Sequence, residues 1–336
     1  MLTEPADLTE EILREALSDG WGVRPTALPY QAVGFGSHHW LALDEAGPLL
    51  FVTVDDLTAK LIGRHDTADD AFARLELAFG AAHALRHAEG LEFVAAPVPD
   101  KYGRVLRRLD GRYSMVVHPH LTGPVAGSEG EYETDADRRA VLELLMRLHA
   151  ADPSCARSDD LVVPGLAELD GAIAMTGQSW QAGPYSERAR SLLATHAGGL
   201  TELVTVYQEL AARVAARPER MVVTHGEPHA SNVVRTPDGL VLVDWDTMLV
   251  AAPERDLWML AARDSSLLDA YSAATGVAVD QDALTVYRMW YDLCEIAGYI
   301  GYFRSPHTDT ADAAESWRNL EYFLRPTERW PGLIPR

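Results

Sequence analysis

Six side chains with oxygen or imidazole groups gather in the stretch from residue 221 to 257. This stretch reads as a short apolar strand, a polar loop, a second strand, a Pro-Asp-Gly turn and a third strand that ends near a carboxylate. The six are His225, Glu227, His229, Asn232, Asp244 and Asp246. Carboxylates and an amide on loops between apolar strands are the groups that a divalent cation and a phosphate-transfer site require. A β-hairpin with a solvated polar tip could account for any one of them, but hardly for the ordered set.

The composition narrows the classes of protein to consider. The chain has 336 residues, enough for two lobes with separate cores. Its formal charge of −21 argues against nucleic-acid binding and would attract a cationic small molecule, although merely soluble acidic proteins are as common. No apolar run reaches membrane-spanning length, and the acidic N-terminal residues lack an apolar signal core. Two isolated cysteines fit a reducing cytoplasm. We expect a cytoplasmic protein, monomeric or dimeric, without membrane association.

The first 120 residues predict a mostly antiparallel sheet with one long helix. A helix over residues 7–18 begins at Asp7 or Thr9, and helical periodicity returns over 68–89. The expected strands flank a glycine loop from residue 28 and continue at 49–54, 94–98, 104–109 and 113–118. The loop Gly34-Phe35-Gly36 could close over phosphates with its backbone amides, although an ordinary hairpin has the same pattern.

Beyond a Gly- and Pro-rich segment that opens at His118, the pattern becomes helical. Helices are predicted at 134–150, 184–195, 199–217, 254–273, 281–303 and 309–324. The predicted fold class is therefore α+β with two lobes. The expected divisions are a β-rich lobe over 1–118, a hinge over 119–130 and a helical lobe over 131–336, with a ligand site between the lobes.

These residues resemble the aminoglycoside phosphotransferase family, which shares the protein-kinase-like fold. The family loop, His-Gly-Asp followed by Asn, is matched by His225-Gly226-Glu227 and Asn232. The family's metal-binding segment is matched by Leu242-Val243-Asp244-Trp245-Asp246. The sequence Pro-Glu-Arg-Asp-Leu at 253–257 looks most like the spectinomycin phosphotransferase branch. The resemblance covers nearly the whole chain and implies ATP and Mg²⁺ as cofactors.

The resemblance also implies roles for particular residues. Asn232 and Asp244 would hold Mg²⁺ against the nucleotide phosphates, and Glu227 would orient the acceptor hydroxyl. His225 would brace the loop by hydrogen bonding, and Asp246 and Asp256 would be structural. The backbone of His118 and His120 would contact adenine, while Gly34 and Gly36 would cover the phosphates.

The chain departs from the family at two of these positions. The family's base is Asp, whereas Glu227 carries one more methylene, which moves the carboxylate by about 1 Å. The lysine expected on the third strand is replaced by Thr53. Lys60 lies just beyond that strand, and the other candidate substitutes are Arg64, Arg74, His38 and His39. Glu76, which matches the lysine's usual partner, is equally well explained as a solvated helix position.

An acceptor pocket is expected against the late helices. Its candidate wall consists of Trp290, Tyr291, Asp292 and Glu295, with Tyr299 one turn further on. Aromatic and acidic side chains together suit a cationic, hydroxylated ligand. The alternative is a core-facing aromatic stripe with exposed acids.

The leading hypothesis is an ATP- and Mg²⁺-dependent phosphotransferase that acts on a hydroxyl of a small cationic molecule, such as an aminocyclitol. A second hypothesis is a kinase-fold binding or regulatory module that lost turnover together with the strand lysine. A metallohydrolase built on His225, His229, Asp244 and Asp246, and a kinase that acts on a peptide side chain, are further alternatives.

Overall fold

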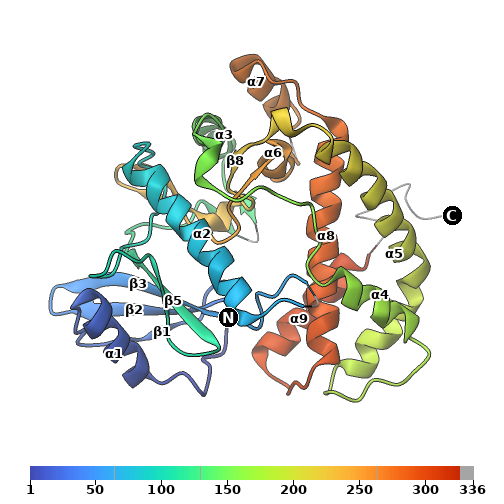
Figure 1. Ribbon diagram of the computed structural model, residues 1–336, viewed down its shortest axis with the longest axis horizontal. Coiled ribbons are helices and arrows are strands. Elements are labelled where there is room, and N and C mark those ends of the chain that lie inside the picture. The colour runs from blue at the N-terminus through green and yellow to red at the C-terminus, as the bar shows by residue number, and fades with distance from the viewer. Residues whose placement is uncertain (64, 129, 263, 326–336) are drawn as a thin grey trace.

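The computed structural model describes residues 1–63, 65–128, 130–262 and 264–325. A β-rich lobe contains the N-terminal third of the chain, and a larger helical lobe contains the rest (Figure 1). This arrangement confirms the expected two-lobed α+β fold. The boundaries at 118 and 130 stay predictions, although the sheet of the first lobe ends at Pro119.

A five-stranded antiparallel sheet forms the centre of the first lobe. Its order is β1-β2-β3-β5-β4, which places the long strand β3 in the middle. The strands are β1 (Tyr30–Gln31), β2 (His38–Asp44), β3 (Gly47–Asp56), β4 (Leu106–Arg108) and β5 (Tyr113–Pro119). Leu50, Val52 and Val54 alternate along β3 and pack into the core beside Trp40, as the period of a half-buried strand requires.

Two helices cover this sheet. Helix α1 (Glu10–Trp21) begins at Thr9, whose side chain accepts a hydrogen bond from the amide of Ile12. Helix α2 (Ala68–His87) begins with a capping box between Thr67 and Asp70. The first half of α2 packs on the sheet and its second half packs on the core of the helical lobe. The helix therefore fixes how the two lobes meet.

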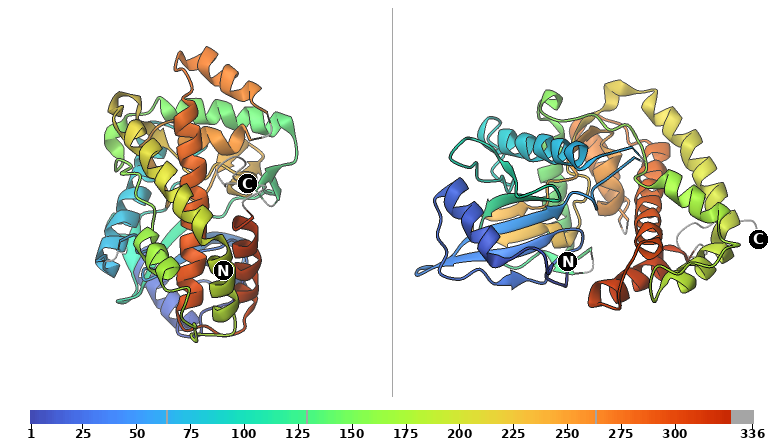
Figure 2. Two further views of the ribbon diagram at one scale, coloured as in Figure 1. Left: turned by 90° about the vertical axis from the view of Figure 1, so that its right-hand side faces the viewer. Right: turned by 60° about the horizontal axis from the view of Figure 1, so that its bottom comes forward.

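Helices dominate the second lobe, and three pairs of short strands hold loops within its described residues. The helices are α3 (Asp135–His149), α4 (Leu166–Ala174), α5 (Ser186–Ala215), α6 (Glu254–Leu260), α7 (Ser266–Thr275), α8 (Gln281–Arg304) and α9 (Ala311–Phe323). The strands are β6 (Gly127–Ser128), β7 (Glu131–Tyr132), β8 (Val222–Thr224), β9 (Val233–Thr236), β10 (Gly239–Leu242) and β11 (Leu249–Ala251). Helices α5 and α8 run side by side and share the largest core of the lobe (Figures 1 and 2).

Three sequence-based predictions of elements were wrong. Residues 94–98 form no strand, because only Val94 bridges to Leu242. The two helices expected at 184–195 and 199–217 are one helix, α5, because its apolar stripe against α8 outweighs the cost of about 1 kcal/mol for each interior glycine. The helix expected at 254–273 is two helices, since Asp264 accepts hydrogen bonds from Ser266 and starts a new helix there.

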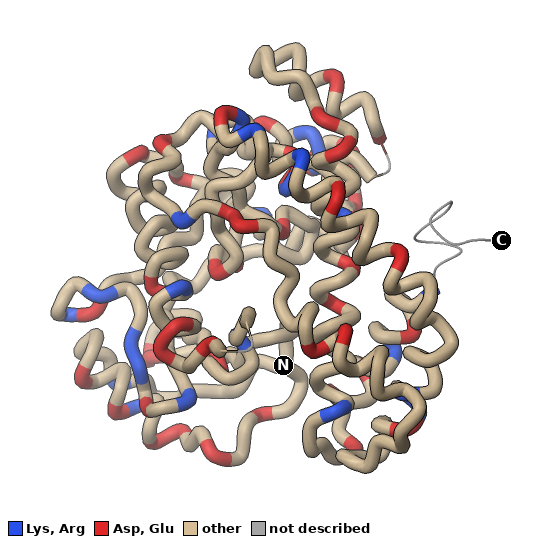
Figure 3. Tube along the Cα trace, turned by 45° about the vertical axis from the view of Figure 1, so that its right-hand side comes forward, with Lys and Arg blue, Asp and Glu red and all other residues tan. Residues whose placement is uncertain are grey.

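Charged residues lie over both lobes. Along the Cα trace of Figure 3, acidic positions are more frequent than basic ones, in keeping with the 50 acidic and 29 basic residues of the chain. Within the described residues, no helix combines the length and the apolar character that crossing a membrane requires.

Candidate functional site

The polar loop between β8 and β9 is held by two separate strand pairs. Strand β8 pairs with β11, and β9 pairs with β10 through the Pro-Asp-Gly turn. Register places Val233 opposite Leu242, so that Asn232 and Val243 lie side by side, and the amide of Val243 donates to the carbonyl of Asn232. The loop and the segment after β10 therefore meet at one end of the hairpin. The sequence did not predict the pairing of β8 with β11.

A buried carboxylate sets the conformation of the loop at Gly226. Asp256 accepts hydrogen bonds from the amides of His225 and Gly226, at 2.9 and 2.6 Å, and from Nε2 of His149 at 3.1 Å. Burial alone would raise the pKa of Asp256, but the hydrogen bond and charge of His149 outweigh it and lower the pKa. The predicted structural role of Asp256 is confirmed.

The His225 side chain braces the same loop, as expected. Its Nε2 donates to the carbonyl of Val243 at 2.9 Å, and its Nδ1 accepts from the amide of Glu227 at 3.2 Å. The imidazole is fully buried and packs edge-on against the ring of Trp245, with ring centres 4.6 Å apart. Trp245 is itself fully buried, and burial of its ring stabilises this position by about 2–3 kcal/mol. The Trp245 side chain therefore anchors its neighbours in the chain, Asp244 and Asp246.

Glu227, the expected base, lies in the loop that follows β8. Its side chain keeps 31% of its surface exposed. Desolvation by the surrounding protein, followed by the nearby charges of Asp246 and Glu295, raises the pKa of Glu227 to about 7. A carboxylate with a pKa near 7 is suited to hydrogen bond to, and accept a proton from, a hydroxyl group.

Asn232 and Asp244 form an oxygen-rich pair beside Glu227. The Asn232 side chain hydrogen bonds through Nδ2, to the carbonyl of Glu227 at 3.1 Å and to His229 at 3.3 Å. Among the described residues, none donates to its Oδ1. Desolvation and the charges of Asp246 and Glu227 raise the pKa of Asp244 well above its usual range. A free amide oxygen and a carboxylate under negative potential fit a hard divalent cation such as Mg²⁺.

Zinc chemistry finds less support in the arrangement of the same side chains. Within residues 1–63, 65–128, 130–262 and 264–325, no three His, Cys, Asp or Glu side chains are grouped to hold a metal ion. Structural and catalytic zinc sites use at least three such ligands.

Lys60 reaches this site from the first lobe. Its Nζ lies 2.7 Å from Oδ2 of Asp246 and 3.3 Å from Oδ1 of Asp55. Burial alone would lower the pKa of Lys60, but the two carboxylates outweigh it and raise the pKa. The same Nζ lies 4.0 Å from the position that a Cβ would take on Gly36. One ammonium group therefore stands between the glycine loop and the segment that carries Asp244.

Thr53 and the other candidate substitutes for a strand lysine have different partners. The Thr53 hydroxyl lies 3.1 Å from Nδ1 of His39, and His38 lies 3.1 Å from the hydroxyl of Tyr30. Arg74 pairs with Asp66 at 2.9 Å. Glu76 is exposed on α2, and Arg64 is outside the described residues. Of the basic groups among these that the structure describes, Lys60 lies against the carboxylates of the site.

The glycine loop has the conformation that its glycines allow. Gly34 and Gly36 have φ angles of 68° and 92°, which other residues seldom adopt. The ring of Phe35 at the loop's tip lies 6.0 Å from the ring of Tyr299 on α8. The loop thus contacts the helical lobe. At the expected hinge, His118 is the residue before the last of β5, and its ring lies near that of Phe79. The amide of His120 donates to the carbonyl of Leu49 at 3.4 Å.

The expected acceptor wall on α8 divides between two faces of the helix. Glu295 lies close enough to Glu227 to raise its pKa, and Tyr291 packs against Trp258 at 5.5 Å between ring centres. Asp292 instead is fully buried. Trp290 donates from Nε1 to the carbonyl of Val162 at 3.0 Å. Tyr291, Glu295 and Tyr299 follow one another at four-residue spacing and are therefore on one face.

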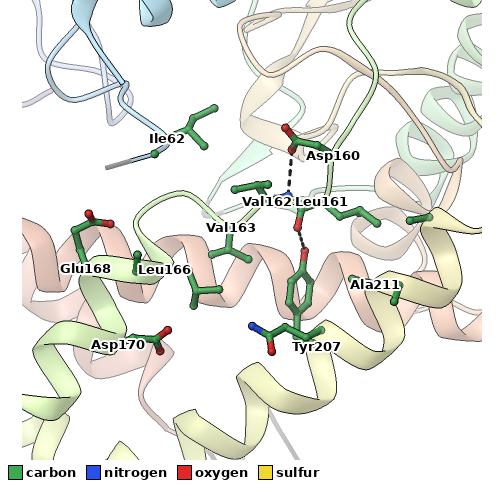
Figure 4. Close-up of a pocket in the computed structure, with 15 residues that line it drawn as sticks. Ile62, Asp160, Leu161, Val162, Val163, Leu166, Glu168, Asp170, Tyr207 and Ala211 are labelled. Carbon is green, nitrogen blue, oxygen red and sulfur yellow. Dashed lines mark hydrogen bonds between the residues drawn. The ribbon is translucent and has the colours of Figure 1, made fainter. Parts of the chain in front are cut away.

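A hollow of about 500 Å³ lies beside the segment that contacts Trp290 (Figure 4). Its walls come from Ile62, the segment 160–170 and the end of α5, where Tyr207 donates to the carbonyl of Leu161 at 2.5 Å. Apolar side chains form most of the lining. Three acidic residues also contribute to it: Asp160, Glu168 and Asp170. None of the residues from 221 to 257 lines this hollow.

Sequence reasoning missed two residues that shape the site. Asp55 is buried, accepts from the Ser37 hydroxyl at 2.7 Å and pairs with Lys60. Arg255 is buried and donates to Thr224 and to the carbonyl of Thr247 at 3.0 and 2.7 Å. An acidic residue at the end of an otherwise apolar strand, as in Val54-Asp55, was the available indication of the first.

Comparison with known proteins finds relatives over most of the chain. The model of the phosphotransferase enzyme family matches residues 49–290. Protein StrN of Streptomyces griseus is 30% identical over 244 residues, which cover 70% of this chain and 72% of StrN.

Two solved structures share the fold at lower identity. The spectinomycin phosphotransferase APH(9)-Ia, in complex with ADP and spectinomycin, is 16% identical with a TM-score of 0.72, over 96% of this chain and 99% of that one. The choline kinase LicA of Streptococcus pneumoniae is 14% identical with a TM-score of 0.55, over 94% and 98% of the two chains.

Proposed function

The chain belongs to the phosphotransferase enzyme family, and we propose that it transfers the γ-phosphoryl group of ATP, with Mg²⁺, to a hydroxyl of a small cationic molecule. The observation that carries the proposal is the meeting of Glu227, Asn232, Asp244 and Lys60 at one junction of the two lobes. Phosphoryl transfer needs positioning and charge stabilisation, and these four groups supply both.

Glu227 orients the acceptor. The hydroxyl oxygen attacks the γ-phosphorus, the bond to the β-phosphate oxygen breaks, and ADP leaves. Glu227 accepts a hydrogen bond from the attacking hydroxyl and takes its proton as the new ester bond forms. Its pKa of about 7 matches this task better than that of an ordinary carboxylate, because the protonated and deprotonated forms are then close in free energy.

Lys60 takes the place of the missing strand lysine. Its ammonium group contacts the nucleotide phosphates from the side of the glycine loop, while Asp55 and Asp246 hold it in position. Asn232 and Asp244 are the residues that would hold Mg²⁺. The ion, when bound, neutralises phosphate charge as the γ-phosphoryl group is transferred.

The charges around the acceptor position favour a cationic substrate. After desolvation, the charges of Asp246 and Glu295 each raise the pKa of Glu227, so negative charge gathers around this side chain. A protonated amine on the acceptor would relieve this repulsion, and aromatic rings of Tyr291 and Tyr299 border the same face of α8. Spectinomycin, which is bound in one structural neighbour, and choline, after which another is named, are of this chemical kind. An aminocyclitol such as spectinomycin is therefore the first acceptor to test.

The direct test is a transfer assay with radiolabelled ATP, Mg²⁺ and a panel of aminocyclitols, aminoglycosides, choline and uncharged polyols. The proposal predicts a labelled product with at least one cationic acceptor and little with uncharged polyols. Label transferred to none of them, together with no ATP hydrolysis, would contradict it.

One observation favours a second function, a binding or regulatory module without turnover. Thr53 replaces the strand lysine, and its hydroxyl is engaged with His39. Calorimetry with an ATP analogue separates the two functions. A module binds ligand without transferring phosphate, and the change Thr53→Lys would then raise its affinity for the nucleotide.

A further inference from the structure

We propose that Asp312, on α9 of the helical lobe, is a positioning residue for the glycine loop of the other lobe. It acts through residues 1–3, which lie between the two. For its effect on the nucleotide this inference rests on the proposed function, whereas the physical link does not depend on turnover.

The Asp312 carboxylate binds the backbone of the first residues directly. Its Oδ1 accepts from the amide of Leu2 at 2.8 Å, and its Oδ2 accepts from the amide of Thr3 at 3.0 Å. Asp312 is 5% exposed, so these two hydrogen bonds to a charged acceptor form away from solvent. The sequence separation of about 310 residues makes this one of the longest-range contacts in the chain.

The same three residues contact the glycine loop and the sheet. The nitrogen of Met1 lies 2.6 Å from the carbonyl oxygen of Ser37 and 3.2 Å from that of Gly34. The hydroxyl of Tyr30, on β1, donates to the carbonyl of Met1 at 2.7 Å. Residues 1–3 are therefore a strap with one side on the glycine loop and the other on α9. Figure 1 shows the N-terminal end of the chain between the sheet and α9.

The strap contacts the glycine loop next to the residues that connect this loop to Lys60 and to α8. Ser37 donates to Asp55, which pairs with Lys60, and Phe35 contacts Tyr299. A loop with two positive-φ glycines has high freedom unless other groups restrain it. The strap supplies that restraint from the opposite lobe, so the loop keeps the position in which its amides and Lys60 face the same phosphates.

Two substitutions sever the link from opposite ends. Asp312→Ala removes both acceptors. Thr3→Pro removes one of the two donated hydrogen bonds and leaves Asp312 in place, because proline has no amide hydrogen. Thr3→Ala keeps the amide and is the control for the second. Asp282→Ala is the control for Asp312→Ala. Asp282 is the second residue of α8, just as Asp312 is the second residue of α9, but Asp282 pairs with Arg213 on the surface.

The readout is hydrogen–deuterium exchange of the peptide that contains residues 33–37, measured on the whole chain. Asp312→Ala and Thr3→Pro are expected to speed exchange at Gly34–Ser37 by about tenfold or more, as the loss of hydrogen bonds to a charged group implies. The controls are expected to leave it unchanged. Exchange of the α9 peptide reports whether Asp312→Ala unfolds that helix. If it does, the proposal is tested with Thr3→Pro alone. Unchanged exchange of the loop in Thr3→Pro, with Asp312→Ala either unchanged or unfolded, would overturn the proposal.

A second measurement concerns the nucleotide. The dissociation constant of the ATP analogue AMP-PNP with Mg²⁺ is expected to rise about tenfold in both variants and in neither control. A wild-type protein that binds no AMP-PNP would contradict the proposed function, whereas the exchange of the loop would still decide the role of Asp312. Normal affinity in both folded variants would overturn the positioning role even if the loop exchanged faster.

Discussion

The Nζ atom of Lys60 lies 2.7 Å from Oδ2 of Asp246, and this ion pair joins the two lobes beside the predicted metal ligand Asp244. A lysine at position 53 would extend from the middle strand of the sheet. Lys60 instead comes from the loop after β3 and is held by Asp55 on its other side. Under the proposed function, Lys60 supplies from a loop the charge that a lysine at position 53 would supply from a strand.

Glu227→Gln is expected to lower kcat by about 10²–10⁴-fold, because an amide cannot take the proton of the acceptor hydroxyl. Affinity for Mg²⁺ and ATP should change by less than about threefold, since the fold and the phosphate contacts remain. Glu295→Gln is the matched comparison and should mainly raise KM for a cationic acceptor. Initial-rate kinetics with both substrates varied measure these effects. Equal losses of kcat in the two variants would count against the separate roles.

Asp244→Asn is expected to weaken binding of the Mg²⁺ complex of ATP by about tenfold or more, because it removes an anionic ligand. Without Mg²⁺ the same variant should bind ATP as well as the wild type or better, since one repulsive charge is gone. Asp238→Asn, at the exposed hairpin turn, serves as the control. Calorimetric titrations with and without Mg²⁺ check the pair of outcomes. A variant whose affinity falls equally in both conditions would show that Asp244 acts through the fold.

Gly226→Ala is expected to destabilise the protein by about 3 kcal/mol or more. Its φ is 104°, and a Cβ there would lie 2.5 Å from the guanidinium of buried Arg255, whose hydrogen bonds would have to shift. Gly276→Ala isolates the backbone cost, about 1 kcal/mol, because Gly276 has φ 74° and open space around it. Urea denaturation of both variants gives the comparison. A similar loss of stability in the two would mean that Arg255 yields without cost.

His118→Gln is expected to make stability less sensitive to acid. Burial lowers the pKa of His118 to about 4, so the folded protein prefers the neutral ring. Below about pH 6.5 the unfolded chain binds a proton that the folded chain does not, and stability falls until about pH 4. Removing His118 should recover about 2 kcal/mol of the loss between pH 7.5 and pH 5. Urea denaturation at both pH values, with the exposed His65→Gln as control, measures this difference. An unchanged loss in His118→Gln would contradict the burial argument.

Local sequence patterns were sufficient where local physics decides the structure. The cap at Thr9, the periodicity of α2 and the turn between β9 and β10 all follow from residues close in sequence. The proximity of four polar residues could likewise be predicted, because they belong to one motif within a short stretch: His225, Glu227, Asn232 and Asp244. The bracing by His225 and Asp256 could be anticipated because the buried loop needs partners for its amides.

Long-range contacts decided what the sequence could not show. The glycine pair at 198–199 does not end α5, because packing on α8 compensates for it. The pairing of β8 with β11 and the burial of Asp292 depend on how distant segments meet. Lys60 could be named as a candidate beside Thr53, but its two carboxylate partners come from β3 and from residue 246. The link from Asp312 to residues 2 and 3 has no local pattern at all.

The most direct measurement is kcat/KM for ATP in Lys60→Met and Lys101→Met, with an acceptor that the wild-type protein phosphorylates. These are the two lysines of the chain, and Lys101 pairs with Asp19 on the surface. Lys60→Met should lose about 10²-fold or more, as the removal of a cation from the phosphates implies, and Lys101→Met should stay within about twofold of the wild type. Addition of Thr53→Lys to Lys60→Met should restore part of the loss. If Lys60→Met keeps the wild-type kcat/KM for ATP, Lys60 does not replace the strand lysine and the central claim is contradicted.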